Sequence, residues 1–180
     1  LASILDPNPV MFLAPKALLR VRGTPAQRLP GEPEDPQVLS KMIDAPLGDR
    51  SAWTPRWPEL EDLIIPIGQA SIARAGTDVT VVSYGRMMHV ALQAAEAAAQ
   101  EGIETEVIDM RSLAPYDWQT IKESIQKTQR VLFLNEDTEV TNFGEHLLRR
   151  TVEDIQDAVA FLVILGVLFV IFIADIQHFI

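Results

Sequence analysis

An acidic and an amide residue are each followed by a proline near the start of the chain, in the stretch "DPNPVMF". Asp6 and Asn8 alternate there with Pro7 and Pro9. A backbone stiffened by proline presents their side-chain oxygens in a narrow range of directions, and such oxygens are the ligands that hard cations prefer. The same pattern is typical of a plain turn, because Asp and Asn side chains bond to their own backbone in turns. From the residues alone, both interpretations, a cation site and a structural turn, stay open.

The three histidines are the next residues that could carry acid–base chemistry or bind a metal. His89 lies in the first turn of a predicted helix that follows a strand, near the sheet edge where ligands bind in α/β folds. The sequence places no partner acid or base beside it, so a partly buried helix residue is the favoured interpretation. His146 adjoins Glu145 and is expected on a helix surface or at a subunit contact, and His178 lies in a short polar end segment.

An acidic loop, "NEDTEVTNFGEH", joins a predicted strand to a predicted helix at residues 135–146. Its carboxylates could bind a cation or a basic partner. Acidic residues near a helix N-terminus also stabilise the helix through its dipole, and this interpretation is favoured here.

What the sequence lacks removes several classes of chemistry. The chain has no cysteine, which excludes disulfides, thiolate metal sites and a cysteine nucleophile. No G-x-G-x-x-G loop follows the first predicted strand, and neither a serine nucleophile elbow nor an H-E-x-x-H motif occurs. The net charge of −10, without a basic stripe, argues against a nucleic-acid partner.

The N-terminal third has the composition of an extended arm. Eleven of the twelve prolines lie in residues 1–66, and each removes a backbone donor and fixes φ. This predicts a short strand at Val10–Leu13 and then a turn-rich arm that wraps a larger body. Trp53 and Trp57 on the arm, and Trp118 further along, are expected to anchor it and its neighbours by filling pockets.

Strands and helices alternate across residues 77–157. β-branched runs predict three strands, and Ala-rich or 3/4-spaced apolar patterns predict three helices. The strands cover 78–84, 105–110 and 130–136, and the helices cover 86–100, 115–128 and 142–156. Gly102 is expected to end the first helix, and Asp117 to cap the second. Such alternation predicts βαβ units and a three-layer α/β fold with a mainly parallel sheet.

The tail from Ala158 to Ala174 contains no charged or strongly polar residue. As a helix it would be about 25 Å long, close to the ~30 Å hydrocarbon core of a membrane. Arg149 and Arg150 precede it, which would keep the folded part on the cytoplasmic or matrix side. A membrane-spanning or membrane-embedded helix is the leading prediction. Two buried strands hinged at Gly166, or a foreign tail, stay open.

Two long stretches carry a resemblance to a known family. They are "DPNPVMFLAPKALLR" and "VTVVSYGRMMHVALQAAEAAAQEGIETEVIDMRSLAPYDWQTIKESIQKTQRVLFLNEDTEVTNFGEHLLRRTVE". From about Leu1 to Glu153 the chain closely resembles the beta subunit of thiamine-diphosphate-dependent 2-oxoacid dehydrogenases of the pyruvate and branched-chain type. The resemblance implies a sheet of transketolase C-terminal type. The expected divisions are the end of a pyrimidine-binding-like domain, a Pro-rich linker arm, the transketolase C-terminal-like domain and an apolar tail helix, at 1–20, 21–75, 76–157 and 158–180.

The resemblance also implies a function and partners. The chain would serve in subunit assembly and interfaces during oxidative decarboxylation of a 2-oxoacid, in the cytoplasm or mitochondrial matrix. Its implied partners are an alpha subunit, a second beta subunit and an acyltransferase core. The assembled enzyme would use thiamine diphosphate and magnesium, which this chain is not expected to bind alone. The family's activating glutamate and catalytic histidine lie in a preceding half, so no catalytic residue is assigned here.

One site does transfer by the resemblance. In the family, a structural potassium ion is held partly by a backbone carbonyl aligned with Ser3 and by residues aligned with Asp6 and Asn8. The remaining ligands would come from the preceding half.

The segment after Asp154 departs from what the family leads us to expect, and it leaves a non-enzymatic alternative. In that interpretation the chain is an accessory or structural subunit of a membrane protein complex, anchored by residues 158–174.

Overall fold

The computed structural model describes residues 1–16, 18–20, 31–43, 59, 64–136 and 142–155, and the backbone of 160–165. The chain forms two compact units, Leu1–Ile65 and Pro66–Ile180.

The described part of the first unit contains only short helices. They are α1 (Ala2–Leu5), the 3₁₀ helix η1 (Leu18–Arg20) and α2 (Pro36–Ile43). The predicted strand at Val10–Leu13 is wrong, because these residues have no regular secondary structure. A strand needs a hydrogen-bonded neighbour, and the described residues of this unit contain none. Met11 and Phe12 are exposed at 84% and 81%, and Trp53 and Trp57 lie outside the described residues.

The second unit is built on a five-stranded sheet with the order β1-β3-β2-β4-β5. The strands are β1 (Ser71–Arg74), β2 (Val79–Ser83), β3 (Thr105–Asp109), β4 (Arg130–Asn135) and β5 (Ala160–Leu165). All neighbouring pairs are parallel except β1 with β3. The predicted mainly parallel sheet is therefore confirmed, and residues 71–74, placed by the sequence in the arm, add an antiparallel edge strand to it.

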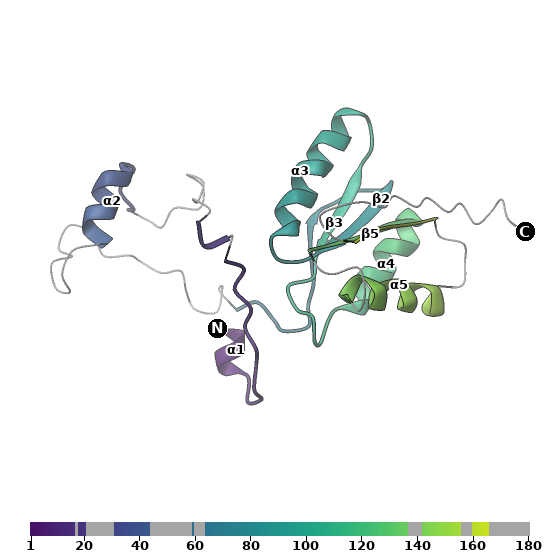
Figure 1. The fold of residues 1–180 in the computed structure, drawn as a ribbon, viewed down its shortest axis with the longest axis horizontal. Helices are drawn as coiled ribbons and strands as arrows, with labels where there is room; N and C mark the ends of the chain where they lie inside the picture. The colour runs from purple at the N-terminus through teal and green to yellow at the C-terminus, as the bar shows by residue number, and fades with distance from the viewer. Residues whose placement is uncertain are drawn as a thin grey trace, which may run out of the picture. The chain divides into compact units, whose positions relative to one another are not determined.

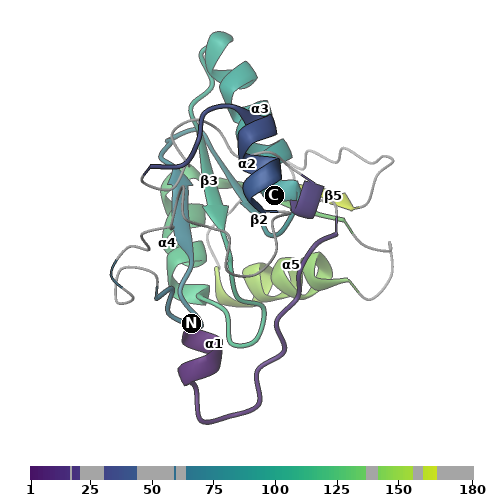
Figure 2. The same cartoon turned by 90° about the vertical axis from the view of Figure 1, so that its left-hand side faces the viewer.

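Three helices cover the two faces of this sheet, in the predicted order. They are α3 (Met87–Gln100), α4 (Trp118–Thr128) and α5 (Phe143–Asp154). On the α3 face, Val81 and Val107 pack with Met88, Ala91 and Ala95. In both views α3 lies above the strands and α5 below them (Figures 1 and 2). The three-layer prediction is confirmed.

The opposite face carries the larger core. Val82, Ile108 and Phe133 from three neighbouring strands pack there against residues of α4 and α5, including Ile121 and Leu147. Consecutive residues such as Val81 and Val82 enter different cores because strand side chains alternate between faces. This explains why the strands are apolar without a polar alternation.

The tail is a strand where it is described, which corrects the predicted apolar helix. Ala160–Leu165 pair in parallel with β4, from Arg130↔Ala160 to Asn135↔Leu165. Strands of parallel sheets are often apolar at nearly every position, so their composition resembles that of a short membrane segment. The first of the two alternative strands is thus confirmed, while residues 166–180 lie outside the described residues.

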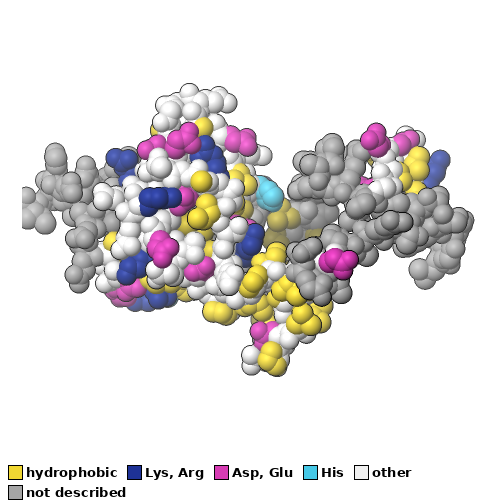
Figure 3. Space-filling model, turned by 180° about the vertical axis from the view of Figure 1, so that it is seen from behind, with side chains coloured by type: hydrophobic (Ala, Val, Ile, Leu, Met, Phe, Trp, Pro, Cys, Tyr) yellow, Lys and Arg dark blue, Asp and Glu magenta, His cyan; other side chains and the backbone are white. Residues whose placement is uncertain are grey.

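Within the described ranges, every helix falls short of the length and apolar character needed to cross a membrane. On the face drawn in Figure 3, Lys and Arg side chains alternate with Asp and Glu over the sheet unit.

The predicted cap of α4 is confirmed and can be tested. The Asp117 carboxylate accepts hydrogen bonds from the Thr120 backbone N–H at 3.1 Å, the Thr120 hydroxyl at 2.8 Å and the Ala70 N–H at 3.1 Å. Burial acts to raise the pKa of Asp117, but these three bonds outweigh it and lower the pKa below its ordinary value. The bonds favour the charged form, so the cap stabilises the fold above the ordinary pKa and is lost as pH falls.

We expect Asp117→Ala to reduce the free energy of unfolding by about 1–2 kcal/mol at neutral pH. The difference from the unmodified chain should shrink as pH falls below the ordinary carboxyl value of 3.8, because the unfolded chain binds a proton there while the folded carboxylate still resists it. Urea unfolding across pH measures both effects. Glu123→Ala is the matched control on the same helix, since its exposed carboxylate bonds only to Gln119 among the contacts described. An equal loss of unfolding free energy in the two variants would contradict the stabilising role of the Asp117 cap.

Candidate functional site

The candidate cation ligands near the N-terminus form a turn that is held by its own side chains. Asp6 follows α1, and its Oδ1 accepts the Asn8 backbone N–H at 2.9 Å and the Asn8 side-chain amide at 3.0 Å. The turn that "DPNP" predicts is therefore present in the structure. The backbone bonds described around α1 end on the carbonyls of Leu1 and Ala2, and none of them uses the carbonyl of Ser3.

These three residues supply hard oxygen donors, which suits potassium. They do not form a complete site by themselves, since potassium-like cations take six or more oxygens. Among the described residues no group of three or more histidine or acidic side chains gathers in a way that could hold a metal ion.

The three histidines lie in three different environments or positions relative to the described residues. His89 is exposed on α3, so the favoured interpretation of a partly buried residue is wrong for the described unit. His146 is half-buried in the first turns of α5 and contacts the rings of Tyr116 and Phe143. His178 lies outside the described residues, as does most of the acidic loop between Glu136 and Asn142.

An aromatic cluster lies where the parallel strands end, and we call it the carboxyl-edge cluster. It consists of residues that follow β2, β3 and β4: Tyr84, Tyr116, Trp118, Phe143, His146 and Arg150. Tyr116 is its centre, with edge-to-face contacts to Trp118, Phe143 and His146 at ring-centroid distances of 6.4, 5.4 and 5.5 Å. Ligands of open α/β sheets bind at this edge, so the cluster has the expected position of a functional site.

Hydrogen bonds fix the polar groups of this cluster. Arg150 Nη1 donates to Tyr116 Oη at 2.7 Å, and the same hydroxyl shares a hydrogen bond of 2.7 Å with His146 Nε2. The Arg150 guanidinium lies 4.7 Å from the centre of the Trp118 ring, whose Nε1 donates to Asp154 Oδ2 at 2.7 Å. The hydrogen bond to Tyr116, and then the pairing with Asp154, raise the pKa of Arg150 against the effect of burial. Arg150 therefore stays charged.

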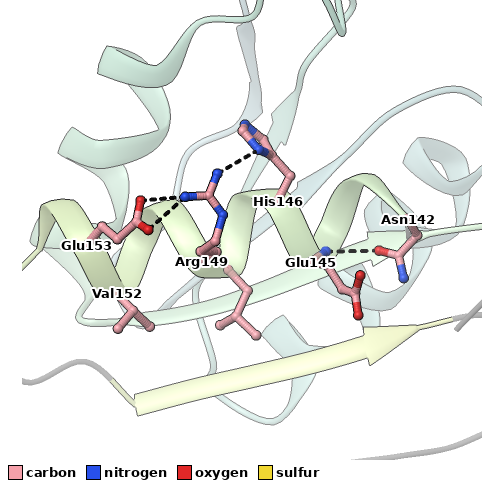
Figure 4. A pocket seen from close by; sticks show the side chains of 7 residues that line it. Asn142, Glu145, His146, Arg149, Val152 and Glu153 are labelled. Atoms are coloured by element: carbon pink, nitrogen blue, oxygen red, sulfur yellow. Dashed lines mark hydrogen bonds and ion pairs between the residues drawn. The ribbon is translucent and has the colours of Figure 1, made fainter. Parts of the chain in front are cut away.

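A shallow hollow of about 760 Å³ runs along the outer side of α5 (Figure 4). It is lined by Asn142, Glu145, His146, Leu148, Arg149, Val152 and Glu153. Arg149 donates to both carboxylate oxygens of Glu153 at 2.7 Å, and its other nitrogen lies 3.5 Å from His146 Nδ1. Arg149 thus pairs with Glu153 and lies beside the His146 ring in this hollow.

The chemistry available at this edge is that of a contact surface. The Tyr116–His146 pair could pass a proton, but its hydroxyl and ring nitrogen already bond to each other and to Arg150. Val152 is 59% exposed beside these paired charges. Charged groups that satisfy one another around exposed apolar side chains are typical of the rim and core of protein interfaces.

One buried amide at the same edge lacks partners. Asn135, the last residue of β4, is 3% exposed, and neither polar atom of its side chain has a hydrogen-bond partner in the part of the chain that the structure describes. Its predecessor Leu134 pairs with Ser83, which places Asn135 one step further along the strand, level with Tyr84. The amide therefore lies beside the carboxyl-edge cluster.

The sequence analysis did not find the carboxyl-edge cluster. Tyr116 is 30 residues from His146 and 34 residues from Arg150 in the sequence, and no spacing rule links residues in different βαβ units. The usable signal was positional, because Tyr84 ends one predicted strand, and Tyr116 and Phe143 come after the next two.

Comparison with known proteins connects the second unit to a described family. The model for "Transketolase, C-terminal domain" matches residues 68–167. The match extends through β5, so the expectation that the chain departs from the family throughout 155–180 is wrong for the first part of the tail. The chain also resembles a solved "Split gene transketolase, inactive beta4 tetramer", with a TM-score of 0.52 and 29% identity over 64% of this chain and 39% of that one.

Curated relatives include two that are similar over most of this chain and one that is similar over a shorter stretch. The pyruvate dehydrogenase E1 component subunit beta of Rhizobium meliloti is 37% identical over 156 residues, which is 87% of this chain and 27% of the relative. The 3-methyl-2-oxobutanoate dehydrogenase subunit beta of Mycobacterium tuberculosis is 37% identical over 153 residues, or 84% and 34% of the two chains. An acetoin:2,6-dichlorophenolindophenol oxidoreductase subunit beta of Cupriavidus necator is 49% identical over 72 residues, or 40% and 21%. The chain spans about a third or less of these relatives.

Proposed function

The chain belongs to the transketolase C-terminal domain family, and on this premise we propose that it is the C-terminal portion of a 2-oxoacid dehydrogenase beta subunit. Its role is subunit assembly and interface formation during oxidative decarboxylation of a 2-oxoacid. The observation that carries the proposal is the similarity to pyruvate and 3-methyl-2-oxobutanoate dehydrogenase beta subunits over 84% to 87% of the chain. A shared fold alone would be a weaker basis, because one fold serves many functions.

The surface of both units supports an interface role. In the first unit Ile4, Met11 and Phe12 are each more than 80% exposed, an unusual density of large apolar side chains for a free surface. In the second unit the carboxyl-edge cluster and the hollow along α5 offer paired charges around Val152. The proposed partners are an alpha subunit, a second beta subunit and an acyltransferase core, in the cytoplasm or mitochondrial matrix.

The assembled enzyme, by this proposal, uses thiamine diphosphate and magnesium, held by chains or segments other than the one described. For potassium we propose a partial site in the first unit. The Ser3 carbonyl and the side-chain oxygens of Asp6 and Asn8 would supply some of its ligands, and the donor chemistry fits. A preceding segment of the beta subunit would supply the others.

Reconstitution tests the proposed function. The chain is co-expressed with a related alpha subunit and with a related beta subunit truncated before the residue that matches Leu1. We expect a stable complex that decarboxylates a 2-oxoacid with reduction of an artificial electron acceptor. The control omits this chain, and it should give no complex and no turnover. If the three chains remain separate on size exclusion while each is folded by circular dichroism, the proposal is wrong.

A further inference from the structure

A carboxylate lies buried at the amino edge of the sheet, opposite to the carboxyl-edge cluster. Glu106 is the second residue of β3, and its side chain is 2% exposed. Glutamate is almost never fully buried unless it is paired, because removing a charge from water costs several kcal/mol. The residues that bond to Glu106 therefore show how its buried charge is stabilised.

Four residues join Glu106 in what we call the amino-edge network: Thr80, Ser124, Lys127 and Thr128. Ser124 Oγ donates to Glu106 Oε1 at 2.5 Å, and the Lys127 ammonium donates to Oε2. Thr80 on β2 shares hydrogen bonds of 2.7 Å with Ser124 and Thr128 of α4. The network thus connects the last turns of α4 to the first residues of β2 and β3.

Lys127 differs from the rest of the network because it reaches the carboxylate from the solvent side. Its side chain is 46% exposed, whereas Glu106, Thr80 and Ser124 are buried. The positive charge can be removed without disturbing the apolar core beneath. The Glu106 carboxylate lies beneath α4, so it can reach water only if α4 moves.

The other charged groups at this edge are paired elsewhere. Arg74 bonds to Glu104 at 2.8 Å and to the Thr105 carbonyl. The Asp78 carboxylate accepts the Glu104 N–H at 2.7 Å, and Arg130 donates to the Asp78 carbonyl at 3.4 Å. On the remaining side, the backbone N–H of Gly76 lies 3.5 Å from Glu106 Oε2. Lys127 is the cation that bonds Glu106 within the described residues.

We propose that Lys127 acts as a removable charge lock: its ammonium holds the last turn of α4 against β2 and β3, and its neutralisation releases that turn while the sheet stays folded. The device is independent of the proposed enzyme role. It makes the amino edge sensitive to any change that removes the lysine charge.

The pH dependence of stability should reverse when the lock is removed. Burial acts to raise the pKa of Glu106, but the bonds from Lys127 and Ser124 outweigh it, so the pKa lies below the ordinary 4.5. The carboxylate therefore stabilises the unmodified chain above that value, and the contribution is lost as pH falls. Without Lys127, only the bonds from Ser124 and Gly76 oppose the effect of burial, and we expect the pKa of Glu106 to rise. The contribution is then present in acid and lost as pH increases.

Lys127→Met tests the lock by hydrogen exchange and urea unfolding across pH. We expect amides in the last turn of α4 to exchange roughly tenfold faster or more at neutral pH, the change that one pKa unit represents. In the unmodified chain the Glu106-dependent stability should fall as pH drops below the ordinary carboxyl value of 4.5, whereas in Lys127→Met it should fall as pH rises above that value. Lys122→Met removes the same charge from the same helix and should keep the original slope and exchange.

The double variant Glu106→Gln/Lys127→Met removes both charges and keeps the proposal falsifiable. It should fold and lose the Glu106-dependent slope even where Lys127→Met alone fails to fold. Failure of both variants to fold would show that the lysine is needed for packing rather than charge, and would overturn the lock. An unchanged slope in Lys127→Met, or faster exchange spread equally over all helices, would also overturn it.

Discussion

Gly76→Ala should prevent the second unit from folding stably. A Cβ at this position would lie 2.2 Å from the Thr105 carbonyl carbon, 2.3 Å from the Glu106 nitrogen and 2.6 Å from the Glu104 oxygen. All three are backbone atoms of or next to β3, so no side-chain rotation can relieve the contact. The following residues, Thr77 and Asp78, both donate to the Glu104 carbonyl at 2.9 Å and hold the segment close. We expect a loss of about 3 kcal/mol or more.

Urea unfolding of the sheet unit in the full chain measures this loss, with Gly102→Ala as the control. Gly102 has φ +82°, and a Cβ added there would meet nothing within 4 Å, so its alanine variant suffers backbone strain without a steric clash. That strain costs about 1 kcal/mol. Equal losses in the two variants would mean that β3 can move away from Gly76, and the close approach would not be essential.

Trp118→Ala should produce the second large loss, about 3–5 kcal/mol. Trp118 begins α4 and is 9% exposed, and its ring belongs to the core that contains Ile121, Ile125 and Phe133. Truncation leaves a cavity in that core. It also removes the donor to Asp154 and the ring on which Arg150 lies.

Trp118→Phe separates packing from the hydrogen bond. Phenylalanine keeps an aromatic ring in the core but cannot donate to Asp154, so we expect a smaller loss of about 1–2 kcal/mol. Calorimetric or denaturant unfolding of the two variants under identical conditions provides the comparison. A Phe variant as unstable as the Ala variant would place most of the stabilisation in the polar contacts of the carboxyl-edge cluster rather than in burial.

The sequence predicted the parts of the fold that depend on local pattern. The strands at 79–83 and 105–109 are β-branched runs, and the Asp117 cap precedes residues with helical spacing. The antiparallel strand β1 was missed, because Ser71–Arg74 is short and pairs with β3 over more than 30 residues of sequence. Such long-range pairing leaves no local signal.

The amino-edge network could likewise be predicted only in part. Glu106 interrupts the apolar strand "TEVID", and a buried charge of this kind could have been suspected from the sequence. Its partner Lys127 lies 21 residues away on α4, and only the fold brings the two together. The tail was misjudged for the opposite reason, because uniform apolar composition is shared by membrane helices and by strands of parallel sheets.

The strand order also has a consequence for synthesis of the chain. β2 is central and is made before β3, β4 and β5, so each of these later strands finds a hydrogen-bonding neighbour that the ribosome has already delivered. β2 itself must wait for β3, and the strand that waits longest for its neighbour β3 is β1, which is made before β2. During translation its backbone donors and acceptors are therefore open to other chains for longer than those of the later strands. β1, an edge strand without a single fully buried residue, is thus the strand of the nascent chain most exposed to wrong pairing.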